Sequence, residues 1–152
     1  MNKKQKLLQY LKSQKLMSLS TCGDKPWTSN VYYTIDDNFH LYFLSEPESR
    51  HCKDINANPN VSCSITDSSQ KVTDKKVGTQ IQGTAVQMTD IDQIKKALES
   101  WNRDIPGFAH IINWENMEKH IIKSKVYKIT PTSIKFLNEA LYGPEGTETF
   151  KF

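Results

Sequence analysis

The segment Ser45-Glu-Pro-Glu-Ser-Arg-His51 places two hydroxyls, a guanidinium and an imidazole within seven residues. It lies between an apolar, aromatic run and a stretch with helical character. A helix N-terminus presents free backbone N–H groups and a partial positive charge, so it is already an anion site. Ser45 and Ser49 add hydroxyl donors. Arg50 adds a planar fork suited to phosphate oxygens, and His51 adds a ring N–H. The segment therefore predicts a site for a phosphate-bearing ligand.

The strength of such a site follows from the number of its donors. Each charge-assisted hydrogen bond contributes roughly 1.5–3 kcal/mol net. Three or four of them, with stacking of an aromatic ligand, reach about −8 kcal/mol, which is micromolar affinity. The same letters also fit a capping box from Ser45 to Glu48, in which Ser45 serves the backbone. Arg50 would then pair with Glu48 or Asp54 on a solvated face. Local sequence leaves both interpretations open.

The bulk composition predicts one soluble domain over residues 1–152. The chain has 24% charged and 37% hydrophobic residues, which fits a globular protein with its own core. A net charge of +3 gives little support to a nucleic-acid surface. No apolar run has membrane-spanning length and no signal peptide is recognisable, so a cytoplasmic protein without membrane contact is expected. Three scattered cysteines and the lack of a CxxC or HxxxH pair predict neither a disulfide framework nor a zinc site.

The elements that would position these donors follow from hydrophobic periodicity. Strands are expected at residues 16–22, 27–35, 39–45, 61–66 and 77–88, with a closing strand pair in 125–138 around a Thr-Pro-Thr turn. Helices are expected at residues 2–14, 48–58 and 89–101, with a helical turn or two in 115–122. Gly83 should mark a bulge or a close backbone approach. Six or so antiparallel strands with flanking helices predict a mainly β domain, a barrel.

The order of these elements resembles the flavin-binding split β-barrel superfamily typified by pyridoxamine 5′-phosphate oxidase, and in particular its small members. The resemblance runs from about Leu16 to Leu137. It rests on the strand LMSLSTC, the turn GDKPW, the strands SNVYYTIDDN and HLYFLS, and the Gly-x-Ala of QGTA. Its most specific part is the pattern S-R-H-x-x-D-I-x-x-N-P-x-V. The order and spacing of the motifs carry the resemblance, rather than any one of them.

This resemblance implies a homodimer with flavin mononucleotide (FMN) at the subunit interface, each site drawing on both chains. It implies that Ser45 lies near the FMN phosphate, that Ser49 and Arg50 match a family Ser-Arg pair, and that His51 replaces a family lysine. The flavin ring would lie against the backbone of residues 43–45. The implied cofactor-binding residues are Ser29, Asn30, Phe43, Leu44, Ser45, Ser49, Arg50, His51 and Gln80.

Three departures from the family pattern are visible. Ser29 stands where many members have an arginine that reaches the phosphate, with Asn30 or Lys25 as possible substitutes. The family's strand glutamine corresponds to Gly78, so Gln80, which faces the same way, is the candidate. The C-terminal tryptophan and arginine that the oxidase uses for its substrate have no match. Pyridoxamine phosphate oxidation itself is therefore not expected.

The leading hypothesis is an FMN-dependent oxidoreductase acting on a small-molecule substrate. No side chain is assigned a catalytic role, because the flavin ring would carry the redox chemistry. Residues 102–124 would help to shape a substrate cleft, and the three tryptophans would lie in the core or at a dimer contact. Two alternatives are a non-catalytic protein that binds or stores flavin or a haem-like ligand, and a degenerate barrel without cofactor. Ser29 favours the last alternative.

Overall fold

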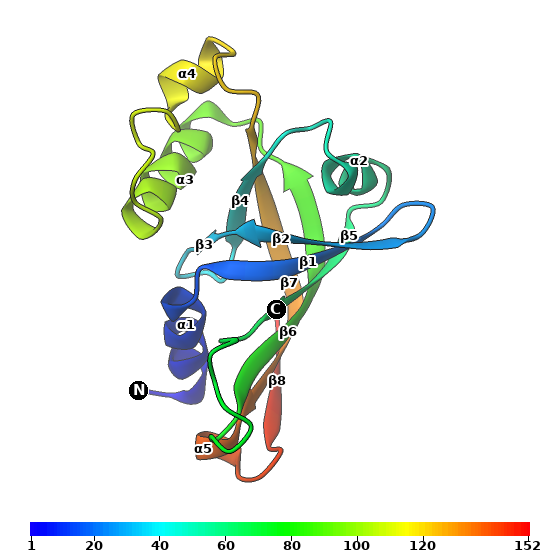
Figure 1. Cartoon of the computed structure of the whole chain (residues 1–152), viewed down its shortest axis with the longest axis vertical. Coiled ribbons are helices and arrows are strands. Elements are labelled where there is room, and N and C mark those ends of the chain that lie inside the picture. Colours follow the sequence, from blue (N-terminus) through cyan, green and yellow to red (C-terminus); the bar gives the residue numbers. More distant parts are fainter.

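Eight strands form one antiparallel sheet that curls into an open barrel (Figure 1). The computed structural model describes residues 1–152. The strands are β1 (Leu16–Cys22), β2 (Pro26–Tyr32), β3 (Thr34–Ile35), β4 (Leu41–Ser45), β5 (Asn60–Ile65), β6 (Val77–Gln87), β7 (Lys125–Asn138) and β8 (Thr147–Lys151). The helices are α1 (Lys3–Ser13), α2 (Arg50–Ala57), α3 (Ile91–Asp104), α4 (Trp114–Glu118) and α5 (Glu139–Tyr142). The prediction of a mainly β split barrel with flanking helices is confirmed.

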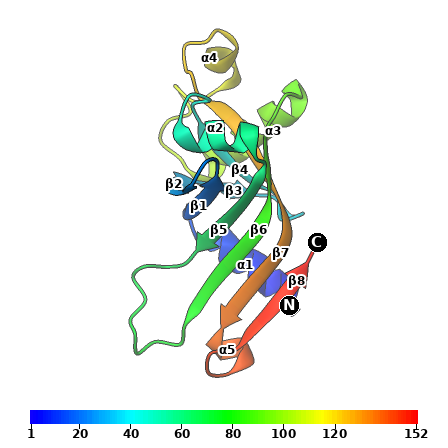
Figure 2. The same ribbon diagram turned by 90° about the vertical axis from the view of Figure 1, so that its right-hand side faces the viewer.

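The strand order explains why the sheet must curl. The order is β2-β1-β5-β6-β7-β4-β3, with β8 also paired to β7. The two outermost strands, β2 and β3, are separated in sequence by Tyr33 alone. The two edges of the sheet must therefore meet. β2 packs beside β4 without a hydrogen-bonded ladder between them, which leaves the barrel split at this seam. Figure 2 shows β5, β6, β7 and β8 side by side.

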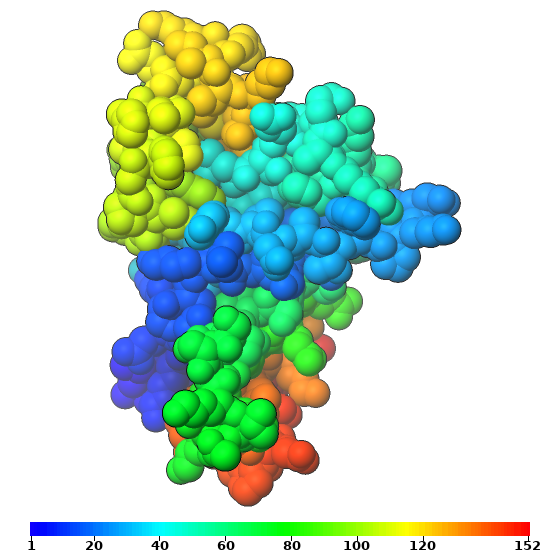
Figure 3. Space-filling view, viewed as in Figure 1, coloured from blue at the N-terminus to red at the C-terminus, as the bar shows by residue number.

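The inner face of the barrel is filled by alternate apolar residues of the strands. α1 covers one end of this core with Leu7 and Leu11, both fully buried. A smaller cluster, which includes Ile94, Leu98 and Met117, packs α3 and α4 against the sheet. Burial of each such side chain stabilises the fold by about 1.5–3 kcal/mol. In the space-filling view, α3 and α4 form one lobe, α2 forms another, and the β1–β2 hairpin projects at the side (Figure 3).

Two strand predictions are wrong. Residues 27–35 form two strands, because the chain leaves one edge of the sheet at Tyr33 and enters the other edge. The expected pair in 125–138 is one continuous strand, β7. Its proline, Pro131, lies opposite Gly83 at a register shift in the β6–β7 ladder, where a missing N–H is tolerated. A Cβ on Gly83 would lie 2.4 Å from the Thr130 carbonyl oxygen, so the predicted close backbone approach is confirmed.

The helices agree more closely with the sequence. α1 begins after Asn2, whose side chain forms a capping box with Gln5. α3 begins after Asp90, whose carboxylate accepts a hydrogen bond from the backbone N–H of Gln93. α3 runs three residues beyond the predicted end. The segment after residue 138 was not assigned from sequence, and it forms α5 and the edge strand β8. No helix in the structure has the length and apolarity needed to cross a bilayer.

Candidate functional site

The junction between β4 and α2 gathers three of the predicted donors. Ser45 ends β4 and Arg50 opens α2, so four residues connect the strand to the helix. The Ser45 Oγ lies 2.6 Å from Nε2 of His51 and 3.4 Å from the Ser49 Oγ. Ser49 Oγ also lies 3.4 Å from the same ring nitrogen. These three side chains, Ser45, Ser49 and His51, form what we call the junction cluster.

The capping-box interpretation of this segment is wrong. The N-cap residue of α2 is Ser49, and its side chain caps no backbone N–H of the helix. Its hydroxyl donates instead to the Glu46 carbonyl oxygen at 2.7 Å. Ser45 lies in the strand and bonds to side chains of the junction cluster. The first-turn N–H groups of α2 are therefore left without a side-chain cap, which suits an anion better than a closed helix end would.

Arg50 does not pair with an acidic side chain. Neither Glu48 nor Asp54 lies within ion-pair distance of it, and Glu48 instead pairs with Lys53 at 3.3 Å. The guanidinium carbon of Arg50 lies 3.9 Å from the ring centroid of Trp27 on β2. This cation–π contact holds the face of the guanidinium, while the N–H edge has no protein acceptor. Sequence analysis did not assign Trp27 to the site.

The floor beneath the junction cluster is aromatic. Phe43 on β4 stacks against Tyr127 on β7 with ring centroids 5.2 Å apart, and its ring lies 6.3 Å from that of His51. Burial and the neighbouring Cys52 thiol raise the pKa of Tyr127, so the phenol remains a neutral donor. Burial also raises the pKa of Cys52, but hydrogen bonds with His51 and other neighbours outweigh it and leave this pKa below its usual value. Leu44, the remaining predicted residue of β4, is partly buried with its side chain against the core.

The two predicted residues of β2 lie on opposite faces of the strand. Ser29 shares the inner face with Trp27, and its Oγ is shielded from solvent without a hydrogen-bond partner. A buried hydroxyl left unpaired costs about 1–3 kcal/mol, which a ligand contact would remove. Asn30 lies on the outer face and accepts a hydrogen bond from Ser18 at 2.9 Å. Asn30 is therefore not brought to the junction cluster in one chain.

Gln80 also lies far from the junction within one chain. It pairs with Lys135 on β7, whereas Ser45 pairs with Lys125 on the same strand. Ten residues of a strand span about 33 Å. Only a second copy of the chain could bring Gln80 to the junction.

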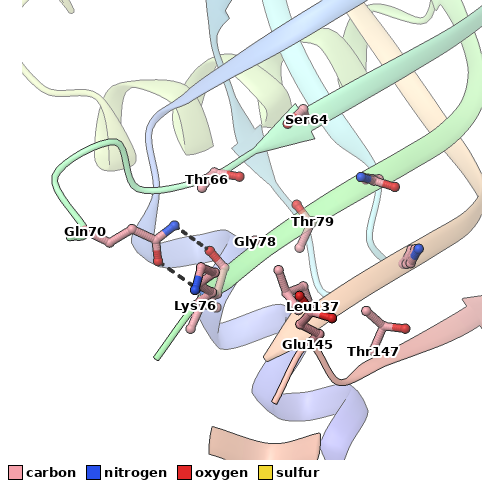
Figure 4. Close-up of a pocket in the computed structure, with 12 residues that line it drawn as sticks. Ser64, Thr66, Gln70, Lys76, Gly78, Thr79, Leu137, Glu145 and Thr147 are labelled. Carbon is pink, nitrogen blue, oxygen red and sulfur yellow. Dashed lines mark hydrogen bonds between the residues drawn. The ribbon is translucent and has the colours of Figure 1, made fainter. Parts of the chain in front are cut away.

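Gln80 is one of the residues that line a polar cavity of about 410 Å³. Figure 4 shows this cavity. Two cations line it, Lys76 and Lys135, together with hydroxyls of the neighbouring strands. The side chain of Gln70 bonds to both the N–H and the C=O of Val77 and closes one side of the cavity. Sequence analysis did not select the two lysines. Lys76 precedes β6 and Lys135 points outward from β7, and lysines in such places also occur on ordinary solvated surfaces.

Residues 102–124 contribute to a second hollow, near the junction. It measures about 430 Å³ and lies between the end of β6, α3 and α4. Its apolar lining is formed by Met88, Ile91, Ile94, Trp114 and Met117. Lys125 lies at its edge and is the β7 residue that pairs with Ser45. The predicted contribution of this segment to a cleft stays a prediction, but the hollow gives it a location.

Comparison with solved structures finds the same fold in proteins of low sequence identity. General stress protein 26 from Bacillus anthracis is 21% identical, with 100% of both chains covered and a TM-score of 0.67. HutZ, the haem storage protein from Vibrio cholerae, is 13% identical, with 86% of this chain and 91% of that chain covered and a TM-score of 0.68. A haem-binding protein from Mycobacterium smegmatis is 14% identical, with 93% of this chain and 55% of that chain covered and a TM-score of 0.73. At these identities the likeness concerns the fold alone.

Comparison of the sequence itself with family models gives a match over nearly the whole chain. No curated protein sequence matches this chain. The model of the family described as pyridoxamine 5′-phosphate oxidase matches residues 4–138, from α1 to the end of β7. The match includes the junction cluster, Arg50 and the cavity strand β6. On this evidence the chain belongs to the pyridoxamine 5′-phosphate oxidase family.

Proposed function

We propose that this chain binds FMN as a homodimer and acts as a flavin-dependent oxidoreductase. The phosphate of the cofactor would be held by Ser45, Ser49, Arg50 and His51. One observation carries the proposal: two hydroxyls, an imidazole and a guanidinium without a carboxylate partner meet at the uncapped N-terminus of α2. This fold family includes both FMN-binding enzymes and haem-binding proteins, so the ligand must be argued from the donors.

The donors fit a phosphate ester better than a neutral ligand. The guanidinium offers a charged fork, and the Ser45 hydroxyl can donate to a second oxygen when it accepts from the ring of His51. The first turn of α2 adds backbone N–H groups and the positive end of the helix dipole. The unpaired Ser29 Oγ lies on the strand face that carries Trp27, and a ligand beside Arg50 could supply its missing partner.

The proposal of a dimer rests on the outer face of four strands, which carries no charged residue. Outward-pointing residues of β1, β2, β5 and β6 are all uncharged, in a chain with 24% charged residues. They are Leu16, Ser18, Ser20, Cys22, Pro26, Thr28, Asn30, Tyr32, Asn60, Ser62, Ser64, Gly78, Gln80, Gln82, Thr84 and Val86. Interface cores are depleted of charge in this way. Pairing of two such faces would bring Gln80 of a second copy toward the junction.

Bound FMN would supply hydride or electron transfer through its ring. The residues of this chain would bind the phosphate, and the backbone of residues 43–45 would orient the ring over the aromatic floor. The substrate would bind in the apolar hollow beside Lys125. No side chain of the site needs to act as a general acid or base.

A second candidate function is non-catalytic binding of haem or a haem-like ligand. It is favoured by the composition of the hollow between α3 and α4, which contains Met88, Met117 and His120. Thioether and imidazole groups are the common axial ligands of haem iron. The two methionines are almost fully buried at 8% and 2% exposure, however, so they would have to turn outward to reach a metal.

The test compares the two arginines of the chain. Arg50→Ala should weaken FMN binding by about ten- to hundredfold, because it removes one or two charge-assisted hydrogen bonds. Arg103→Ala is the matched control, since Arg103 lies in α3 and pairs with Asp104. Affinity is read from the quenching of flavin fluorescence, and thermal unfolding checks that both variants fold. Equal FMN affinity in the two variants would remove Arg50 from the site. Titration of haem into the same proteins tests the second candidate function, which is haem binding.

A further inference from the structure

We infer that Trp27 is a positioning residue that holds the Arg50 guanidinium ready for the ligand phosphate, and thereby makes the site selective for FMN over riboflavin. The inference rests on the proposed function and adds a residue to it. It starts from the contact between the two side chains, with the guanidinium carbon 3.9 Å from the indole centroid.

The contact leaves the binding edge of Arg50 free. Stacking uses the face of the guanidinium plane, whereas its five N–H donors lie in that plane and point away from the ring. In the structure these donors have no side-chain or backbone acceptor, and no carboxylate lies within ion-pair distance. An arginine in this state is held in place without being satisfied. Such an arrangement is complementary to an incoming oxyanion.

Stacking also lowers the entropic cost of binding. A free arginine side chain carries about 2 kcal/mol of rotamer entropy, part of which is lost when its fork grips a ligand. If Trp27 already restricts the side chain, less is lost on binding, which is the general effect of preorganisation. β2 contains no arginine, so Arg50 alone supplies a guanidinium at the junction.

The position of Trp27 supports this role over one in the core. It lies on β2 opposite Thr21, on the same face as Ser29, where the strand passes beside α2. Its side chain is 42% exposed, so the ring is not a core residue in the way that Trp101 is, with 6% exposure. The prediction that Trp101 lies in the core is confirmed. The ring of Trp27 instead contacts the guanidinium of Arg50.

The experiment is a double-mutant cycle with two ligands that differ only by the phosphate. FMN and riboflavin are titrated into the wild-type protein and into Trp27→Leu, Arg50→Ala and the double variant. Trp27→Leu keeps apolar bulk but removes the π face. We expect it to weaken FMN about three- to tenfold, to leave riboflavin almost unchanged, and to have no further effect once Arg50 is alanine. Trp27→Phe should recover part of the loss, because phenylalanine keeps an aromatic face.

Phe152→Leu is the matched control, because Phe152 is an exposed aromatic residue with a cation–π contact to Lys4, outside both the junction and the four strands of the proposed interface. It should leave the ratio of FMN to riboflavin affinity unchanged. An equal loss for both flavins in Trp27→Leu, or an undiminished loss in the Arg50→Ala background, would overturn the inference while leaving the proposed function standing. If the wild-type protein binds neither flavin, the proposed function falls, and the inference falls with it.

Discussion

The Ser45 hydroxyl oxygen lies 2.6 Å from Nε2 of His51, although one residue ends a strand and the other lies in the first turn of a helix. The bond can be made in two ways. If the ring nitrogen donates, the Ser45 hydroxyl keeps its own hydrogen for a ligand. If the hydroxyl donates to the ring, it does not. An anion bound at the junction would favour the first arrangement, and under the proposed function His51 would then act on the phosphate through Ser45.

The first prediction concerns the charge at position 51. His51→Lys should strengthen FMN binding by about three- to tenfold, because it replaces a titratable group by a permanent cation at the same helix N-terminus. His51→Ala should weaken it by a similar factor. His110→Lys, on an exposed residue outside the junction, is the control. A flavin fluorescence titration measures all three, and equal affinities for the lysine and alanine variants at position 51 would contradict the assignment.

The second prediction separates binding from helix capping. Because Ser49 does not cap α2, Ser49→Ala should change the free energy of unfolding by less than about 0.5 kcal/mol while weakening FMN several-fold. Asn2→Ala removes a real capping box from α1 and should cost about 0.5–2 kcal/mol with no effect on FMN. Urea unfolding monitored by circular dichroism gives the first quantity. A larger destabilisation by Ser49→Ala than by Asn2→Ala would restore the capping role.

The third prediction concerns the uncharged outer face. Ser64→Glu places a buried carboxylate at a proposed dimer interface, so it should shift the protein toward a monomer and abolish FMN retention. Lys123→Gln, just before β7, is the control for a change of charge alone, because it also lowers the net charge by one unit. Light scattering coupled to size-exclusion chromatography gives the mass of each variant. A Ser64→Glu protein that has the same mass as the wild type and still binds FMN would show that this face is not the interface.

The fourth prediction uses the acidic side chain at the end of α3. Burial raises the pKa of Asp104, but hydrogen bonds from Arg103 and Thr34 outweigh it and leave this pKa below its usual value. A depressed pKa means that Asp104 stabilises the fold at neutral pH. This contribution is lost as the pH falls below the unfolded-state value of about 3.9 and through the folded-state pKa.

Asp104→Asn should therefore lower the melting temperature at pH 7 and have a much smaller effect near pH 3. Thermal unfolding of the variant and the wild type across this range measures the difference. A gap between the two proteins that stays constant with pH would mean that the carboxylate charge is not the stabilising feature.

Much of the fold was accessible from sequence because its signals are local. The periodicity of α1 and α3 and the alternation in β1, β5 and β6 depend on neighbouring residues alone. Pro131 misled the prediction because a proline in a long apolar run usually marks a turn. Its tolerance in β7 depends on Gly83, almost fifty residues away, which lets the two backbones approach at the bulge.

Only part of the site could be predicted from the sequence, because only some of its contacts join residues that are close in sequence. Ser45, Ser49 and His51 are close in sequence, so their chemistry could be inferred together. The partner of Arg50 could not, because Trp27 comes from another strand and an exposed tryptophan carries no sequence pattern. The position of Gln80 shows a third limit. It lies on the strand that the resemblance implies for a cofactor contact, but about 33 Å of strand separates its register from that of the junction in one chain.

The most direct measurement of the central claim is a visible absorption spectrum of the purified protein, recorded as isolated and again after FMN is added and the protein is desalted. The account predicts that flavin bands remain with the protein after desalting, and that Arg50→Ala loses them while staying folded. A wild-type protein that emerges colourless from the column would contradict the account, because the donors at the β4–α2 junction would then not hold the cofactor.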